Sequence, residues 1–391
     1  MSEEFYTGRS FFTPAFRIEL DGRDTGRAVI ADVLEVSFTD DLAAVDSFEF
    51  TLHDWDPVAG HPKYSSPWDE HGQPFRLSAN GPDVPNFEPG AKVALYFGYL
   101  EDGDLPLVME GEVVSLTPSF PASGVPTCRV RALDAFFRRM QKTEVEGNYS
   151  GTAKDVVDQL CAENDVSVRW ATLDAEGKDE ERVEVEGVLL DEIASRAETY
   201  KLSMMTVAPD TAGADPVLYL ARPSDEDDAP AAEFVWGRTL TSFSPVLSAA
   251  GQISEVVVRA GDPGAEAEER AIEVIRSWAD IGLSPTALGP AGSADLETAV
   301  AGTREIIKPD GVATLEDAEM AALARLRDLA GTLITGSGSS VGLPELRAGR
   351  TVVMAGMGAR FDGVYRLTKT THGIGGSGYT TTFDARKEVL V

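Results

Sequence analysis

Apolar residues recur at every second position through much of residues 1–140, and this period constrains the fold more than any other feature. The clearest alternating triplets are Phe16, Ile18 and Leu20; Leu34, Val36 and Phe38; and Phe48, Phe50 and Leu52. A spacing of two is typical of half-buried β-strands, because successive side chains point to opposite faces of a sheet. Strand patterns resume at residues 93–99, 108–116 and 128–132. Residues 1–140 are therefore predicted to form a small β-barrel or sandwich.

A long segment, residues 53–90, interrupts this rhythm with many Pro, Asp, Gly and Ser residues. Loops of this length inside a compact domain are usually functional or mobile. Possible metal ligands occur at His53, Asp54, Asp56, His61, Asp69, Glu70 and His71. Their spacing matches no zinc or EF-hand pattern, so a polar surface loop without a metal is favoured.

Residues 141–235 are predicted to form a small α/β domain. Thr152 is a suitable N-cap for a helix with an apolar stripe over residues 153–161, and Asn164 lies near its end. A second helix is predicted at about 188–201 and a strand at 217–220. An acidic loop follows at 225–228.

Residues 236–391 return to a β pattern. Strands are predicted at 253–259, 351–355, 364–371 and 379–385, and a helix at 314–330 with Thr314 as its cap and Gly331 as its stop. We expect a second β-barrel here, interrupted by an insertion over about 261–345. The predicted fold class is mainly β with an α/β insertion.

The charge of the chain limits its partners. It carries 65 acidic and 34 basic residues, a net charge of −31, which argues against nucleic acid because phosphate binding needs a basic face. Apolar runs are shorter than the roughly 20 residues that span a bilayer, so no membrane insertion is expected. The N-terminus is acidic, unlike a signal peptide, which predicts synthesis in the cytoplasm. Cys128 and Cys161 lack a zinc-type spacing and are predicted to be buried.

The charge is also uneven along the chain. From the sequence, residues 1–140 have 23 acidic and 11 basic residues (net −12), and residues 141–235 have 23 and 8 (net −15). Residues 236–391 have 19 and 15, a net of only −4. We therefore expect the last segment to supply more of the contacts with other proteins, and the acidic middle segment to face solvent.

Two short patterns resemble catalytic motifs. Residues 373–378 match the letters of GxGxxG, but strand-like residues lie on both sides, which favours a hairpin turn over a dinucleotide site. Residues 338–342 match GxSxG, and Ser340, Asp362 and His372 follow the chain order of an α/β-hydrolase triad. A helix precedes this motif where a strand is required, so a Gly/Ser linker is favoured. No catalytic residue, metal or cofactor is predicted.

Several segments resemble the late control protein D family, the tail hub of contractile phages and phage-like injection systems, and the hub part of type VI secretion spike proteins. Near the N-terminus these are residues 18–24 (IELDGRD), 47–54 (SFEFTLHD), 88–93 (EPGAKV), 96–99 (YFGY), 110–113 (EGEV) and 130–134 (VRALD). The most specific ones are C-terminal: 349–352 (GRTV), 361–365 (FDGVY), 371–372 (TH) and 377–381 (SGYTT).

The resemblance implies a structural protein, not an enzyme. It implies a homotrimer whose six barrels, two per subunit, adapt a six-fold tail tube to a three-fold spike in the baseplate of a tail-like particle. The spike is expected to be a separate protein, and loop 53–90 is a candidate contact for other baseplate proteins. Two alternatives stay open. One is a tail hydrolase that uses Ser340, Asp362 and His372, and the other is an adhesin that exposes Trp55 and Trp68.

Overall fold

The computed structural model describes residues 11–42, 44–68, 71–74, 83–170, 180–199, 202–207, 216–221, 229–261, 271–282, 294–308, 315–376 and 378–388. The chain packs into two compact units. Unit 1 comprises Met1–Lys142, Ser339–Ala348 and Lys369–Phe383, and unit 2 comprises Thr143–Gly338, Gly349–Thr368 and Asp384–Val391. Two segments from the end of the chain therefore complete the unit that forms from its beginning.

Unit 1 is mainly antiparallel β-sheet. Its N-terminal elements are β1 (Pro14–Leu20), β2 (Arg23–Asp24), α2 (Gly26–Asp32), β3 (Val33–Asp41), β4 (Ser47–His53), β5 (Lys92–Tyr99), the 3-10 turn η1 (Leu100–Asp102), β6 (Leu107–Ser119), β7 (Thr127–Asp134) and α3 (Ala135–Lys142). The strands that the alternating pattern predicted in this region are confirmed. The short helices α2 and α3 were not predicted.

The strand order in unit 1 is β21-β20-β3-β4-β7-β6-β5-β1-β2, where β20 is Gly363–Gly375 and β21 is Gly378–Lys387. On β4, Phe48 pairs with Phe38 of β3 on one side and with Ala132 of β7 on the other. These residues, together with Leu95 and Phe97 of β5, belong to one buried core. The alternation in the sequence thus marks the face of the sheet that is removed from water, except at Leu34, which is exposed beside an irregularity in the pairing of β3 with β4.

The strand β20 joins the C-terminal segment to this core. Its residues Lys369 to Ile374 pair with Asp41 to Val36 of β3, partners that lie more than 300 positions apart in the sequence. The turn after β20 connects it to β21, so the GxGxxG-like stretch is a hairpin, as predicted. Ser377 in this turn lies outside the described residues.

Unit 2 begins with an α/β part. Its elements are β8 (Glu144–Gly151), α4 (Ala153–Glu163), β9 (Val168–Trp170), β10 (Glu180–Val188), α5 (Leu189–Thr199), β11 (Ser203–Val207) and β12 (Val217–Ala221). The predicted cap of α4 is confirmed: the Asp155 backbone N–H donates to the Thr152 hydroxyl at 3.1 Å, and the Thr152 N–H donates to the Asp155 carboxylate at 2.8 Å. The acidic segment 225–228 lies outside the described residues.

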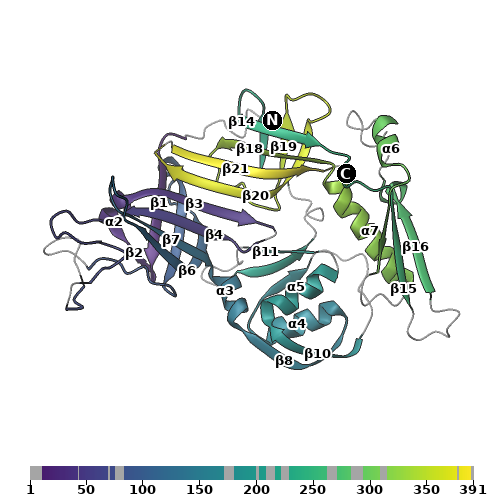
Figure 1. Cartoon of the computed structure of the whole chain (residues 1–391), viewed down its shortest axis with the longest axis horizontal. Helices are drawn as coiled ribbons and strands as arrows, with labels where there is room; N and C mark the ends of the chain where they lie inside the picture. Colours follow the sequence, from purple (N-terminus) through teal and green to yellow (C-terminus); the bar gives the residue numbers. More distant parts are fainter. Residues whose placement is uncertain are drawn as a thin grey trace. The chain divides into compact units, whose positions relative to one another are not determined.

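The rest of unit 2 contains a separate three-stranded sheet. The elements that follow are β13 (Ala232–Val235), β14 (Leu240–Leu247), β15 (Glu255–Gly261), β16 (Ala271–Ser277), the 3-10 turn η3 (Trp278–Ile281), α6 (Ala294–Val300), β17 (Arg304–Ile307), α7 (Leu315–Gly331), β18 (Ile334–Val341) and β19 (Thr351–Ala355). Helix α7 packs along the sheet β16-β15-β17 (Figure 1), and Arg325 of α7 binds Glu305 of β17 at 3.0 Å. Thr314, the expected cap of α7, is outside the described residues.

Two expectations about this region need correction. Strand β15, which was assigned to the second barrel, belongs to the separate sheet, because its partners are β16 and β17. Residues 338–342 are not a linker, because β18 extends to Val341 and pairs in the large sheet. Gly336 and Gly342 lie so close to aromatic rings that a side chain at either position would overlap a ring. A Cβ on Gly336 would lie 2.6 Å from the Phe243 ring, and one on Gly342 would lie 2.1 Å from the Tyr379 ring.

The chain is mainly β, as predicted. Among the described residues the path of paired strands has two ends, at β14 and β2, so closure into barrels stays a prediction. The division at residues 140 and 235 also stays a prediction. In the part of the chain that the structure describes, no helix is both long and apolar enough to cross a bilayer.

Candidate functional site

The three residues of the possible triad have different surroundings. Ser340 lies on β18, is buried, and donates its hydroxyl hydrogen to the Val341 carbonyl at 2.9 Å. Asp362 precedes β20 and accepts from the Met357 N–H at 2.8 Å. A nucleophile elbow needs a sharp turn between a strand and a helix, whereas Ser340 lies within a strand. The described hydrogen bonds do not join these side chains into a proton relay.

His372, on β20, is bound on both ring nitrogens within unit 1. Its Nε2 lies 2.8 Å from the Leu346 carbonyl, which can only accept, so Nε2 carries the hydrogen. Its Nδ1 then accepts from the hydroxyls of Tyr379 and Thr381, at 2.9 and 3.0 Å. Burial lowers the pKa of His372 to about 4, so the ring is neutral near pH 7. A neutral ring with no free nitrogen does not suit a general base.

Close to His372, the side chain of Arg347 contacts the carboxyl groups of Asp40 and Asp46. The Arg347 guanidinium forms an ion pair with Asp40 through Nε and lies 3.7 Å from Asp46 through Nη2. It also lies over the Phe38 ring, 4.8 Å from the ring centre. The Asp40 carboxylate additionally accepts from the Ala348 N–H at 3.2 Å. Arg347 and Ala348 are therefore held by the end of β3 and by Asp46 just before β4.

The carboxyl groups of this cluster differ in protonation. Burial and, to a lesser extent, the neighbouring Asp40 carboxylate raise the pKa of Asp46 to about 8, against the opposing effect of Arg347. Burial also raises the pKa of Asp134, whose carboxylate accepts from the Phe137 N–H at the start of α3. With Asp46 largely protonated near pH 7, the cluster carries less negative charge than its three carboxyl groups suggest. The smaller charge reduces the free-energy cost of removing the cluster from water.

We define the residues Asp40, Asp46, Arg347, His372, Tyr379 and Thr381 as the polar lock. The lock contains the histidine, tyrosine and threonine of the C-terminal segments that carried the family resemblance, and it explains why they occur together. Sequence reasoning missed Arg347 and the two aspartates, since no local pattern relates residues 40–46 to residue 347. A half-buried Arg facing paired carboxyl groups positions strands, and it offers no nucleophile and no open metal position.

Loop 53–90 is tied to unit 1 by a second set of polar contacts. The fully buried Asp54 carboxylate accepts from the N–H groups of Tyr64 and Ser65, at 2.6 and 3.0 Å. The Tyr64 hydroxyl donates to Asp32 at 2.7 Å, and both Tyr64 and Phe87 belong to the core. The described part of this loop is thus packed against the sheet over much of its length.

Two of the possible metal ligands in this loop, Asp54 and Asp56, bind backbone N–H groups. Asp54 is bound as described, and Asp56 accepts from the N–H groups of Val58 and Ala59, which lowers its pKa through the Ala59 bond first. Within the described residues no three His, Cys, Asp or Glu side chains are grouped to hold a metal ion. Asp69 and Glu70 are outside the described residues.

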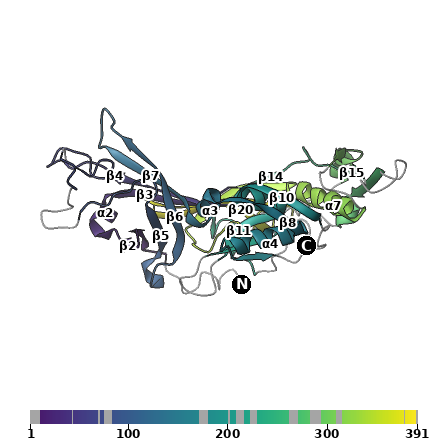
Figure 2. The same cartoon turned by 90° about the horizontal axis from the view of Figure 1, so that it is seen from below.

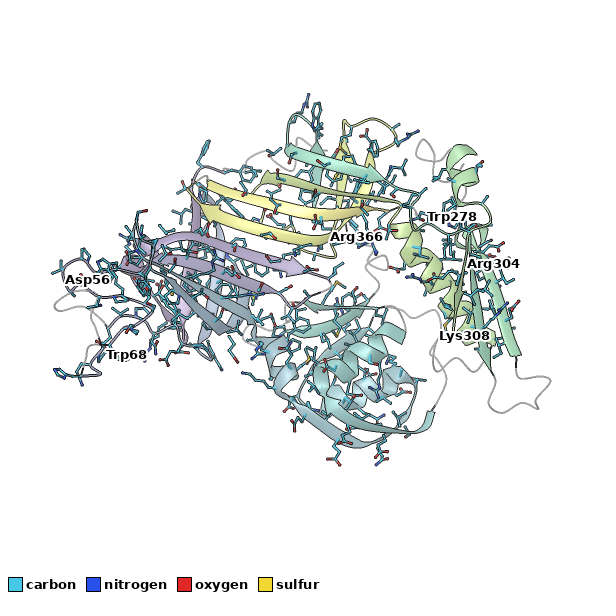
Figure 3. All side chains as sticks on the ribbon, viewed as in Figure 1. Asp56, Trp68, Trp278, Arg304, Lys308 and Arg366 are labelled. Atoms are coloured by element: carbon cyan, nitrogen blue, oxygen red, sulfur yellow. The ribbon has the colours of Figure 1, made fainter. Side chains whose placement is uncertain are left out.

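Exposed aromatic side chains occur where the sequence did not indicate them. Trp68 of the loop is 39 % exposed, whereas Trp236, between β13 and β14, is 60 % exposed. Trp55 and Trp68 are therefore not the only candidates for an aromatic binding platform. Figure 3 shows Asp56 and Trp68 on the loop after β4. Cys128 and Cys161 are buried as predicted, and burial raises the pKa of each thiol to about 12.

The family model described as Alg8 N-terminal domain matches residues 69–375 of the chain. No curated protein matched in a search of known sequences.

Solved structures show the same fold. The 43 kDa tail protein of prophage MuSo2 from Shewanella oneidensis is 14 % identical, with a TM-score of 0.65 over 97 % of this chain and 99 % of that one. The tail protein from Neisseria meningitidis MC58 is 13 % identical, with a TM-score of 0.61 over 97 % and 98 %. The E. coli c3393 protein, a component of the type VI secretion system, is 11 % identical, with a TM-score of 0.51 over 96 % and 80 %. The resemblance to phage tail and type VI proteins drawn from the sequence motifs is confirmed.

Proposed function

We propose that the chain, which belongs to the Alg8 N-terminal domain family, is a structural hub of a contractile tail baseplate. The fold and the polar lock support this proposal. The observation that carries the proposal is the likeness to the prophage MuSo2 tail protein, which spans almost the full length of both chains.

In the proposed assembly, three copies form a ring that adapts the six-fold tail tube to the three-fold spike. Each copy contributes two tube-like β domains, residues 1–140 and 236–391, with the α/β domain at 141–235 placed outside the ring. The acidic middle domain then faces solvent, and the nearly neutral last segment makes more of the contacts. The tube protein, a separate spike protein and other baseplate proteins are the proposed partners. The protein is proposed to be made in the cytoplasm and assembled into a tail-like particle.

The polar lock supports a structural role rather than catalysis. His372 has both nitrogens bound and is neutral near pH 7, and the Ser340 hydroxyl is held by a backbone carbonyl. We expect the purified protein and its Ser340→Ala variant to show the same background rate on ester and peptidoglycan substrates. A rate that falls with this substitution would instead support the hydrolase.

The test of the hub is assembly. We expect the full-length chain, co-expressed with the tube and spike proteins of its own gene cluster, to yield a particle with three copies of the chain. Native mass spectrometry counts the copies, and a cryo-electron microscopy map locates them around the axis. Two or six copies, or a chain absent from the particle, would overturn the proposal.

A further inference from the structure

The turn between β13 and β14 presents a large aromatic side chain to solvent. Trp236 is 60 % exposed, and Arg238, two positions later, is exposed as well. Hydrogen bonds fix the turn: the Arg238 N–H donates to the Val235 carbonyl at 3.0 Å, and the Val235 N–H donates to the Thr239 hydroxyl at 2.8 Å. A tryptophan on a fixed turn loses little conformational entropy on docking, so it is suited to anchor a contact with a partner.

Further basic side chains lie on the adjoining loop between β19 and β20 and beside it. The Trp236 N–H donates to the Ala355 carbonyl at the end of β19, at 2.9 Å, so the turn and the loop lie side by side. The loop carries the exposed Arg360, whose carbonyl accepts from the Lys387 side chain at 3.0 Å. We define Trp236, Arg238, Arg360 and Lys387 as the basic corner.

The basic corner belongs to a part of unit 2 whose charge is opposite in sign to that of the whole chain. Residues 229–248, 349–368 and 384–388 contain six basic and four acidic residues, a net of +2, against −31 for the chain. The indole and guanidinium groups of the corner are hydrogen-bond donors, and they match the carboxylates of an acidic surface. Repulsion between the net charges of two proteins is screened over about 8 Å at physiological ionic strength, so the groups in contact decide which surfaces attract.

The β8-β10 sheet of unit 2 offers such an acidic surface. One face of it carries four exposed glutamates, which we call the acidic face: Glu144 and Glu146 of β8, and Glu184 and Glu186 of β10. They share this face because side chains two positions apart on a strand point the same way, and because Glu146 pairs with Glu186. Val185 is buried on the opposite face, and α4 packs beside β8 (Figures 1 and 2).

The acidic face holds like charges at close range. Glu146 and Glu186 are directly opposite each other across the ladder, an arrangement of like charges that destabilises a strand pair. In the part of the chain that the structure describes, none of the four glutamates forms an ion pair or a hydrogen bond. Cationic groups that dock on this face therefore relieve the repulsion between its carboxylates.

We propose that the basic corner of one copy docks against the acidic face of a second copy, with Trp236 as its anchor. The same chain carries both surfaces, and they are complementary: the corner supplies positive charge and donors, and the face supplies carboxylates. Because the two surfaces differ, the contact is head-to-tail, which is the arrangement that closes rings. The inference rests on the proposed function and names the contact between neighbouring copies, while the other faces of the α/β part stay in solvent.

The first experiment places a benzophenone amino acid at position 236 of the full-length protein, both purified and co-assembled with the tube and spike proteins. Irradiation should give a product of twice the chain mass, in which position 236 is joined to β8 or β10 of another copy. The control has the same group at position 58, which is 96 % exposed in loop 53–90, and it should give no link to these strands. A link from position 236 only to another protein, or no link in either preparation, would overturn the inference.

The second experiment exchanges the charges of the two surfaces. Glu146→Lys with Glu186→Lys should weaken self-association at least tenfold, because like charges then face each other across the contact. Arg238→Glu with Arg360→Glu should weaken it equally. A chain that carries all four changes should regain most of the lost affinity, since its corner is then acidic and its face basic.

Two substitutions at exposed positions of unit 1, Asp104→Lys and Arg27→Glu, are the matched controls and should leave self-association unchanged. Sedimentation equilibrium measures the purified variants, and native mass spectrometry counts how many copies of each variant enter the particle. An exchange of all four charges that restores nothing, or an equal loss in the controls, would contradict the proposed contact.

The outcome is separable from the hub test. Three copies in the particle without a link between position 236 and the β8-β10 sheet overturn this contact and leave the proposed function standing. Such a link in a particle with another copy number supports the contact and overturns the ring of three.

Discussion

Replacing His372 by leucine tests whether the polar lock stabilises unit 1. Leucine is close to histidine in size, so the change removes hydrogen bonds with little change in packing. The Leu346 carbonyl then loses its donor, and the Tyr379 and Thr381 hydroxyls lose the acceptor that they share. One of these hydroxyls can still donate to the other, which leaves two groups unpaired. Each buried group left unpaired costs about 1–3 kcal/mol, which gives a loss of about 2–6 kcal/mol for the two groups.

The assay is urea unfolding of the full-length protein, followed by circular dichroism and tyrosine fluorescence. The free energy of unfolding of ordinary domains is about 5–15 kcal/mol. A loss of about 2–6 kcal/mol therefore lowers the urea concentration at the unfolding midpoint clearly. Thr370→Val is the matched control, two positions earlier on β20. Thr370 is fully buried, and its hydroxyl has no hydrogen-bond partner among the described residues, so valine should be neutral or stabilising. A His372→Leu variant within about 1 kcal/mol of the parent protein would refute the reasoning.

The same variant should change the dependence of stability on pH. The folded pKa of His372 is about 4, below the value of 6.5 for a free histidine, so the unfolded chain binds this proton first. The contribution of neutral His372 to the free energy of unfolding is therefore complete above pH 6.5, and it is lost as the pH falls toward 4. The difference of 2.5 pKa units corresponds to about 3 kcal/mol, and His372→Leu should remove that part of the acid sensitivity. If the His372→Leu variant loses stability with falling pH as steeply as the parent protein, another group causes the acid sensitivity.

Three further substitutions test other parts of the structure by the same unfolding assay. Asp46→Asn should stabilise the protein increasingly as the pH rises from 3.8 toward about 8, because Asp46 stays protonated in the folded protein while it ionises in the unfolded chain. A difference in stability between variant and parent that is the same at all pH values would contradict this. Gly342→Ala should destabilise unit 1, because the new Cβ would overlap the Tyr379 ring, whereas Gly376→Ala meets no atom within 4 Å and should not. Thr152→Ala should cost about 1 kcal/mol through loss of the α4 cap, and a loss below about 0.3 kcal/mol would show that the cap is dispensable.

The sequence predicted those parts of the fold that depend on local periodicity. The alternating residues around Phe38, Phe48 and Phe50 placed two strands, β3 and β4, and the buried positions of these residues correctly, because burial of one sheet face imposes a period of two. The Thr152 capping pattern likewise placed α4, since a cap acts within four residues.

Local signals failed where distant segments decide the structure. Residues 338–342 are rich in glycine and serine, which suggested a linker, yet the glycines are needed because aromatic rings lie against that strand. The polar lock could not be predicted from the sequence either. His372 was visible as part of a motif, but its neighbour Arg347 pairs with Asp40, more than 300 positions away, and register between such segments leaves no periodic trace.

The path of the chain through the two units also affects how the protein is made. Unit 1 needs residues up to Phe383, so its N-terminal strands leave the ribosome about 240 residues before their last partners. At about 5–20 residues per second this delay is roughly 10–50 s. During that time β3 lacks the strand that later pairs with it, and an unpaired strand edge is a template for aggregation. This edge of β3 in the growing chain therefore stays open until residues 369–374 of β20 have been made.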